Sequence, residues 1–284
     1  MLVKFGIVYK KDKSFLRSSP ALRGAGLKEE NAKAKELAST INAFLKKGRH
    51  EVLPEAKFGS ADFILILGGD GTFIHKACEF APLGVPFLGI NTGNLGFLTA
   101  CEASDWKEAL NKLGEGKYFV SERITIDAIV EGRKEVYRAI NEIFIKGLFR
   151  AIDLKINVGG ERLIKVFGDG VIVATQTGST AYSLSSGGPI VDANLDCLLL
   201  TPINPIGLPI PSIVLSADEE IEVTLSKGED VSLVLDGQEH TKVKENDLVR
   251  IKKGEFRVKF VYFDKHQFLK SLNAKFGLSN RSLG

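Results

Sequence analysis

The chain has 284 residues, of which 44% are hydrophobic and 26% are charged, and its formal net charge is +3. This length and apolar content suffice for one large core or two medium ones, and the length favours two domains. The small net charge argues against a nucleic-acid-binding stripe and against a disordered acidic tail.

The three cysteines, Cys78, Cys101 and Cys197, are widely spaced, and none lies in a C-x-x-C pair. They are too few for a disulfide framework or a zinc site, so we expect buried thiols in a reducing compartment. The N-terminal segment lacks a signal-peptide pattern, and no uncharged run of about 18 apolar residues is present. These features predict a cytoplasmic protein with neither a membrane nor a nucleic acid as partner.

The first third of the chain alternates strand and helix patterns. Apolar runs predict strands over 2–9, 50–54, 61–69 and 85–91, and 3.6-residue periodicity predicts helices over 28–48 and 103–116. Ser104 is a plausible N-cap of the second helix, and Gly114 marks its end. Strands that alternate with helices predict an open, largely parallel α/β sheet.

After residue 117 the pattern changes to short β-rich runs separated by Gly, Asp and Asn. Alternation in "EIEVTLS" and "FRVKFVYF" is typical of antiparallel strands with one wet face. The last segment returns to helical spacing, which suggests that it packs back on the first domain. We therefore expect an α/β domain over 1–117 with 265–284, and a mostly antiparallel, sandwich-like β domain over 118–264.

The segment "GGDGTF" at 68–73 follows a buried strand directly. Glycines at the carboxyl end of a parallel strand let backbone N–H groups approach a phosphate, and the next helix adds positive potential. Asp70 is unexpected there because a carboxylate repels phosphate. Two interpretations stay open: Asp70 caps the helix, or it meets a hydroxyl or a metal ion beside the phosphates.

Three further segments carry polar groups at similar positions. The first, "GINTGNLGFLT" at 89–99, begins at the end of a predicted strand. The second, "GDGVIVATQTGSTAYSLSSGGPIV", contains a predicted strand that is followed by a Gly-Ser-Thr turn, and the third is the pair Asn141-Glu142, which interrupts an apolar run. Each has an ordinary structural explanation as a turn, a helix cap or a hydrogen-bonded buried pair. P-loop, G-x-S-x-G and H-E-x-x-H motifs are absent, and the four histidines are isolated in the sequence.

Taken in order, "GGDGTF", "GINTGNLGFLT", "AINE", "GDGVIVATQTGSTAYSLSSGGPIV", "LTPINPIGL" and "LDGQ" resemble the NAD kinase family over roughly residues 60–240. The resemblance implies phosphoryl transfer from ATP, or from polyphosphate, to the 2′-hydroxyl of the adenosine ribose of NAD. It implies Mg²⁺ or another divalent cation as cofactor, with unknown protein ligands. It also implies a homo-oligomer, a dimer or a tetramer, with the β-rich domain at the interface.

The same resemblance assigns roles to residues. Asp70 corresponds to the family's base or orienting carboxylate, and Phe97 to an aromatic residue near the adenine. The remaining nucleotide-contacting positions are Gly69, Gly71, Thr72, Asn141, Glu142, Asp169, Thr180, Ala181, Tyr182 and Ser185.

Two positions depart from the family pattern. Gln176 stands where the family usually has Pro, which predicts a less rigid loop, and Ile206 stands where many members carry His. The GGDG turn also occurs in phosphofructokinases and in lipid kinases of the diacylglycerol and sphingosine type. A lipid kinase and a non-catalytic dinucleotide sensor therefore remain as alternatives, although retention of Asp70 argues against the sensor.

Overall fold

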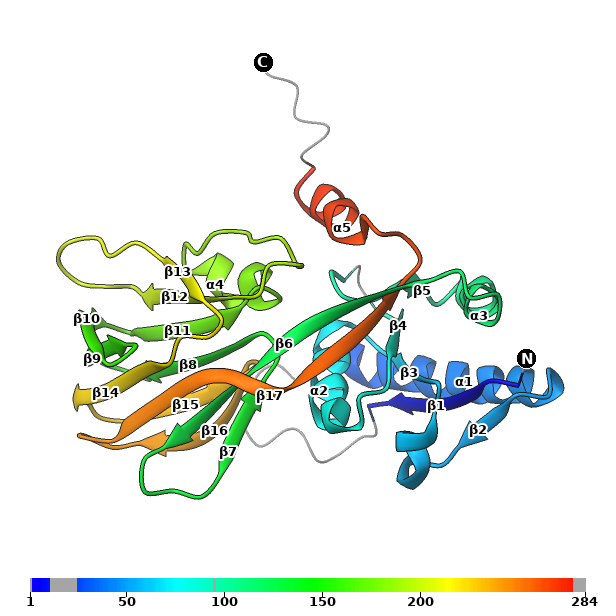
Figure 1. Ribbon diagram of the computed structural model, residues 1–284, viewed down its shortest axis with the longest axis horizontal. Helices are drawn as coiled ribbons and strands as arrows, with labels where there is room; N and C mark the ends of the chain where they lie inside the picture. Colours follow the sequence, from blue (N-terminus) through cyan, green and yellow to red (C-terminus); the bar gives the residue numbers. More distant parts are fainter. Residues whose placement is uncertain (1, 11–24, 94–95, 278–284) are drawn as a thin grey trace, which may run out of the picture. The chain divides into compact units, whose positions relative to one another are not determined.

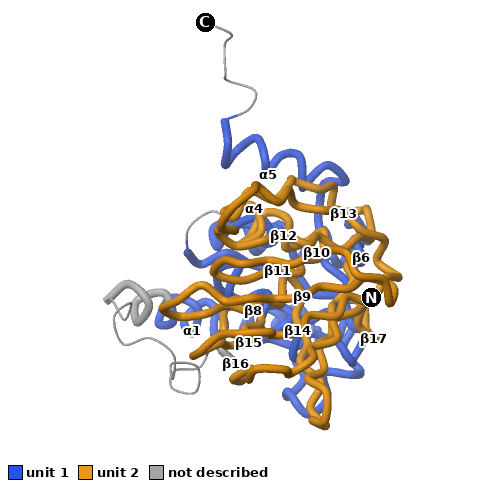
Figure 2. The backbone as a smooth tube through the Cα atoms, turned by 90° about the vertical axis from the view of Figure 1, so that its left-hand side faces the viewer, with its two compact units in different colours: residues 1–122, 258–284 blue, residues 123–257 orange. Residues whose placement is uncertain are grey.

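The computed structural model describes residues 2–10, 25–93 and 96–277. The chain forms two compact units, one from residues 1–122 with 258–284 and one from 123–257, coloured separately in Figure 2. The second unit is thus inserted into the first, and the chain passes between them twice.

The first unit is built on a parallel sheet in the order β2, β1, β3, β4, with β5 and the end of β17 both paired to β4. Its strands and helices are labelled in Figure 1. They are β1 (Lys4–Tyr9), α1 (Ala25–Lys47), β2 (Glu51–Leu53), β3 (Phe63–Leu67), α2 (Asp70–Phe80), β4 (Phe87–Asn91), β5 (Cys101–Glu102), α3 (Trp106–Gly114) and α5 (Gln267–Phe276).

The central strands β3 and β4 are buried at all five positions each, as expected for parallel strands that are covered on both faces. One face packs on α1 and α3 in a single apolar cluster. In α1 that cluster takes Ala34, Ala38, Ile41 and Leu45, which are four of the positions that the helical spacing singled out. The α/β part of the predicted fold is confirmed.

The start of α3 differs from the prediction, whereas Gly114 ends the helix as predicted. Asp105, not Ser104, is the N-cap residue, and the Ser104 hydroxyl lies 2.9 Å from the Asp105 carboxylate. Gly114 is the last helical residue, and the left-handed turn comes two residues later, at Gly116 with φ of 72°. Two adjacent polar residues compete for the cap here, and residue type alone does not decide between them.

The second unit consists of two antiparallel sheets that enclose one apolar core. One sheet runs β10, β9, β14, β17, with β6 on β17 and β7 on β6; the other runs β13, β12, β11, β8, β15, β16 (Figure 1). The strands are β6 (Phe119–Val130), β7 (Val136–Ala139), β8 (Glu142–Gly147), β9 (Ile152–Val158), β10 (Glu161–Gly168), β11 (Gly170–Thr175), β12 (Cys197–Ile203), β13 (Ile213–Ser216), β14 (Ile221–Lys227), β15 (Val231–Leu235), β16 (Gln238–Val243) and β17 (Leu248–Tyr262). Alternate residues of both sheets point into the core, which is the predicted sandwich arrangement.

The outer face of the second sheet is covered by the segment between β11 and β12. That segment contains a single 3₁₀ turn (Gly178–Thr180) and the short helix α4 (Tyr182–Ser185). Tyr182 packs edge-on against Phe144 of β8, with ring centroids 5.0 Å apart. This cover places the "GSTAYS" residues over the start of β8, where Asn141 and Glu142 lie.

Helix α5 belongs to the first unit, as the C-terminal helical spacing predicted. Leu272 is buried, and the Phe276 ring lies 6.0 Å from that of Phe97. Within the described parts of the chain, no helix has both the length and the apolar character needed to cross a bilayer.

Candidate active site

The GGDG turn ends β3 and begins α2 within two residues. Gly68 has φ of 153°, and a Cβ there would lie 2.7 Å from the Thr72 Cβ, so a side chain is excluded on both grounds. Gly69 is the N-cap residue of α2 and Asp70 is its first helical residue. The helix therefore starts two residues after the glycine that follows the strand, with its free N–H groups at the end of the strand.

Asp70 does not cap the helix. Its Oδ2 accepts a hydrogen bond from the backbone N–H of Phe97 at 2.7 Å, and its Oδ1 accepts one from Leu98 at 3.1 Å. These donors belong to the loop after β4, so the carboxylate is held by the neighbouring strand's loop at the carboxyl edge of the sheet. The capping interpretation is wrong, and the carboxylate is fixed in one orientation.

Gly96 shows how closely this loop approaches the carboxylate. A Cβ built on Gly96 would lie 2.1 Å from Asp70 Oδ1 and 2.7 Å from its Cγ. Two of the roughly four acceptor positions of a carboxylate are occupied by the backbone donors, which leaves others free for a hydroxyl. Half-buried Asp70 is therefore a fixed acceptor with spare capacity.

Phe97 lies beneath the C-terminal helix. The Lys275 Nζ is 4.0 Å from the centre of the Phe97 ring, within the range of a cation–π contact. The same residue thus supplies a backbone donor to Asp70 and an aromatic face to α5. The structure brings Phe97 and Asp70 together, as both positions were predicted to belong to one site.

The Asn141–Glu142 pair lies at the start of β8, where Asp236 binds its backbone. The Asp236 carboxylate accepts hydrogen bonds from the N–H groups of Ile140, Asn141 and Glu142 at 2.8–3.1 Å. Asn141 Oδ1 and Glu142 Oε2 are buried and have no hydrogen-bond partner among the described residues. Buried polar atoms of this kind require a partner, so both are candidates for ligand contacts.

Burial raises the pKa of Glu142 to about 8, and the adjacent Asp236 carboxylate adds to the effect. Burial likewise raises the pKa of Asp236 to about 6, while its three backbone donors act in the opposite direction. Both shifts favour the protonated, uncharged form of these carboxyl groups in the folded protein.

The loop after β11 supplies the next group of predicted residues. Ala181 and Tyr182 are half-buried, Ser185 is exposed at the end of α4, and Thr180 Oγ1 lies 3.5 Å from the carbonyl of Thr177. Thr177 Oγ1 is buried and, within the described chain, has no partner. This hydroxyl, beside Asn141 and Glu142 in the same unit, was missed because a Thr before a glycine turn reads as an ordinary cap.

Asp169 lies at the other end of β11. Its carboxylate accepts a hydrogen bond from the Asn204 side chain at 2.8 Å, and its backbone carbonyl accepts one from Gly147. Along β11 Asp169 is thus separated from the "TGSTAY" loop by the whole strand. Lys146, half-buried on β8 next to Gly147, places its Nζ 3.3 Å from the Tyr182 hydroxyl.

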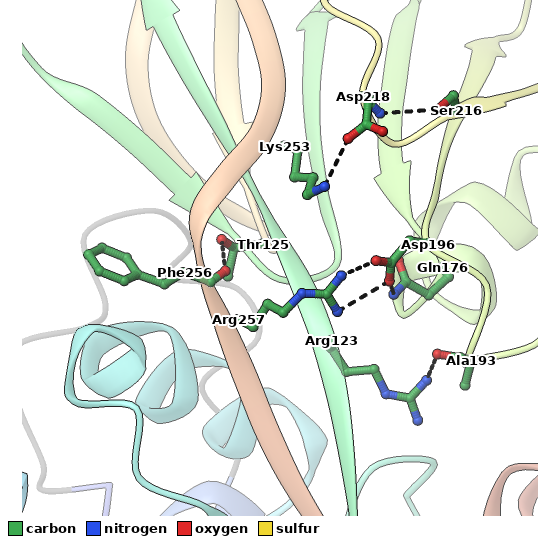
Figure 3. Close-up of polar contacts among 10 residues, drawn as sticks. All are labelled: Arg123, Thr125, Gln176, Ala193, Asp196, Ser216, Asp218, Lys253, Phe256 and Arg257. Atoms are coloured by element: carbon green, nitrogen blue, oxygen red, sulfur yellow. Dashed lines mark hydrogen bonds and ion pairs between the residues drawn. The ribbon is translucent and has the colours of Figure 1, made fainter.

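The side chain of Gln176 is held by a hydrogen bond, in contrast to the less rigid loop that was expected there. It is buried, and its Nε2 donates to Asp196 Oδ1 at 3.2 Å, while Arg257 forms an ion pair with the same carboxylate (Figure 3). Nearby, Arg123 donates from Nη1 to the carbonyl of Ala193. Side-chain contacts therefore restrain the loop in which the family usually has Pro.

Ile206 is exposed and contacts the chain through its backbone N–H, which donates to the carbonyl of Phe167 at 2.7 Å. No group of three His, Cys, Asp or Glu side chains within the described ranges could hold a metal ion. Mg²⁺ commonly keeps several waters and binds through one or two carboxylates plus substrate phosphates.

Comparison with known proteins extends this picture over both units. Residues 6–118 match the model of the ATP-NAD kinase N-terminal domain, and residues 141–263 match that of the ATP-NAD kinase C-terminal domain. The chain is 39% identical to an NAD kinase of Natranaerobius thermophilus, over 76% of this chain and 77% of that protein. It is 42% identical to an NAD kinase of Symbiobacterium thermophilum, over 77% and 79% of the two chains.

Comparison with solved structures points to the same family. The fold superimposes on an NAD kinase from Archaeoglobus fulgidus in complex with ATP with a TM-score of 0.70, at 30% identity, covering 94% of this chain and 96% of that one. A yeast NADH kinase complexed with NADH gives a TM-score of 0.76 at 22% identity, over 100% and 90% of the chains, and supports the fold. These comparisons give no support to a lipid kinase or a non-catalytic sensor. The chain belongs to the NAD kinase family.

Proposed function

We propose that this protein is an NAD kinase that transfers a phosphoryl group from ATP to the 2′-hydroxyl of the adenosine ribose of NAD. One observation carries the proposal: the Asp70 carboxylate is fixed by two backbone donors at the carboxyl end of β3, beside the N-terminus of α2. A fixed acceptor next to a phosphate-compatible turn is the arrangement that this transfer requires. Membership of the NAD kinase family supports the same reaction.

In the proposed reaction the 2′-hydroxyl oxygen forms a bond to the γ-phosphorus of ATP. The bond from that phosphorus to the β,γ-bridging oxygen breaks, ADP leaves, and the hydroxyl proton passes to Asp70. Asp70 acts as general base or orienting group, and the backbone of Gly69, Gly71 and Thr72 lies toward the phosphates. Because phosphoryl transfer depends mainly on positioning and charge stabilisation, one well-placed carboxylate suffices.

The second unit supplies the proposed binding residues for NAD. Asn141 and Glu142 present two buried oxygen atoms that lack a partner among the described residues, which supports a contact with the dinucleotide. Phe97 of the first unit is proposed to lie near the adenine. The other proposed contacts are Asp169, Thr180, Ala181, Tyr182 and Ser185.

Several finer features belong to the proposal. A divalent cation such as Mg²⁺, bound to the donor phosphates, would offset their negative charge; polyphosphate is an alternative donor. A cytoplasmic location and assembly into a dimer or tetramer are proposed from the family resemblance. Exposed apolar side chains of the second unit, such as Phe149 at 85% and Leu208 at 87% exposure, support an assembly interface there. Light scattering on the purified protein tests the assembly.

The test is a direct assay of NADP formation from NAD, Mg²⁺ and either ATP or polyphosphate. Asp70→Asn should lower kcat by about 10²- to 10⁴-fold, the usual contribution of a general base, with little change in the KM for NAD. Asp62→Asn is the matched control, because the Asp62 carboxylate also accepts a backbone N–H, that of Lys4, at 2.7 Å. Absence of NADP with both donors would exclude the proposed function.

A further inference from the structure

One buried hydroxyl joins the two segments of the second unit that carry most of the proposed binding residues. Thr175, the last residue of β11, is fully buried, and its Oγ1 donates to the carbonyl of Ile140 at 2.6 Å. Its backbone N–H donates to the carbonyl of Asn141 at 2.8 Å. Thr175 therefore holds the residues that lead into the Asn141–Glu142 pair through both of its donors.

The same oxygen also accepts hydrogen bonds. The backbone N–H groups of Thr177 and Gly178 lie 3.0 and 3.2 Å from Thr175 Oγ1. A hydroxyl has one donor and two acceptor positions, so all three are used. Thr175 Oγ1 thus connects the 176–182 segment to Ile140, the residue before the Asn141–Glu142 pair, and the backbone of Tyr182 also forms a hydrogen bond with Glu142.

Close packing adds to this connection. A Cβ on Gly178 would lie 2.1 Å from the carbonyl oxygen of Asn141, so the two segments are in backbone contact. On the opposite side, Asp236 binds the N–H groups of residues 140–142. The segment at 140–142 is therefore held from two sides, by Asp236 directly after β15 and by Thr175 at the end of β11.

We propose that Thr175 is a positioning residue, whose hydroxyl sets the Asn141–Glu142 pair and the 177–182 loop in the register that NAD binding requires. This inference rests on the proposed function. Four atoms of the Asn141–Glu142 pair and the 176–182 segment are buried with no partner in the described chain: Asn141 Oδ1, Glu142 Oε2, Gln176 Oε1 and Thr177 Oγ1. Thr175 contacts the backbone of both segments that present them, so its hydroxyl fixes their mutual distances.

Thr175→Val tests the proposal, because valine keeps the shape of the side chain and removes the hydroxyl. We expect the Kd for NAD, measured by calorimetry, and the KM for NAD to rise about tenfold or more, with a smaller change in kcat. Thr175→Ser keeps the hydroxyl and should restore both values to within a few-fold of the unmodified protein. A role confined to stability would lower the melting temperature and leave the Kd and KM of the folded protein unchanged.

Thr125→Val is the matched control. Thr125 is also fully buried in the second unit, and its Oγ1 donates to the carbonyl of Phe256 at 2.7 Å (Figure 3). Its loss should reduce stability by a comparable amount without changing the Kd for NAD. An equal rise in Kd for Thr125→Val and Thr175→Val would overturn the proposal.

A second variant, Asp236→Asn, and the activity of the unmodified protein complete the test. If Thr175→Val does not fold, Asp236→Asn disturbs the same pair from its other side and should also raise the Kd for NAD; an unchanged Kd then refutes the positioning role. Failure of the proposed function is a separate result, since the unmodified protein would then form no NADP. If the unmodified protein forms NADP and the folded Thr175→Val variant has an unchanged Kd for NAD, the positioning role of Thr175 is refuted while the proposed function stands.

Discussion

Replacement of Gly96 by alanine tests the placement of Asp70 without changing the carboxylate. The added Cβ would lie 2.1 Å from Asp70 Oδ1, whereas real Cβ contacts under 3.0 Å essentially do not occur. The carboxylate and the loop must therefore separate by at least 0.9 Å, the difference between these two distances. A shift of about 1 Å in a reacting group costs about 10²-fold in rate, which corresponds to about 2.7 kcal/mol of activation free energy.

The assay is steady-state formation of NADP at saturating ATP and NAD, with folding checked by thermal melting. Gly96→Ala should lower kcat by about 10²-fold; the KM for NAD should rise by a smaller factor, because Phe97 moves with the loop whereas the Asn141–Glu142 pair is unaffected. Gly114→Ala is the control, because a Cβ on that helical glycine meets nothing within 4 Å. A folded Gly96→Ala protein that retains half of its kcat or more would refute the reasoning that fixed carboxylate geometry limits the reaction.

Three other predictions concern the free energy of unfolding and thiol reactivity. The pKa of Glu142 is raised from 4.5 to about 8 in the folded state, so the folded protein binds more protons than the unfolded chain and its free energy of unfolding should fall as pH rises through that interval. Urea unfolding at several pH values should show a weaker dependence of this free energy on pH for Glu142→Gln. The same pH dependence in both proteins would contradict the assignment. Phe73→Ala removes a buried ring whose centroid is 4.8 Å from that of Phe260, and it should lower the free energy of unfolding by about 3–5 kcal/mol. The control Phe149→Ala, at an exposed position, should lower it by about 0.5 kcal/mol or less. Similar losses in both variants would contradict the prediction. Burial and, to a smaller extent, nearby acidic groups raise the pKa of Cys101 to about 12. At pH 8 a thiol reagent should therefore label this residue only after unfolding, which peptide mapping would detect. Rapid labelling of Cys101 in the native protein would contradict this prediction.

Local patterns predict most of the elements of the first unit, although β5 was not among them. The run "FILIL" predicts a strand buried on both faces, and β3 is buried at every position. The spacing of Ala34, Ala38, Ile41 and Leu45 predicts the face of α1 that packs on the sheet. Burial of regular elements follows from periodicity, because the period fixes which side chains share a face.

The partners of Asp70 could not be predicted in the same way. Its carboxylate binds backbone N–H groups 27 and 28 residues further along the chain, and every residue except proline offers such a donor. Residue type therefore carries no signal for the contact. The one hint was Gly96, whose missing side chain makes room for the carboxylate, but a glycine in a loop has many ordinary explanations.

The same reason explains why Thr175 and Asp236 were overlooked. Both act on backbone atoms of the segment at 140–142, so neither forms a recognisable pair with another side chain. Asp236 lies inside the quoted "LDGQ" motif, and a carboxylate directly after a buried strand was the available signal. The binding residues taken from the sequence pattern stay predictions, whereas the hydrogen bonds that hold residues 140–142 became evident only from the fold.

The insertion of the second unit into the first has a consequence for synthesis on the ribosome. Residues 123–257 form one continuous segment whose two ends lie on the paired strands β6 and β17, so all of this unit has been synthesised before the last part of the first unit. The first unit must wait, because Phe260 of β17 adds to the sheet beside Phe87 and α5 supplies the Lys275 that covers Phe97. The unit that is begun first is therefore completed last, and a nascent chain arrested near residue 257 would carry the Asn141–Glu142 pair but an unfinished surrounding for Asp70.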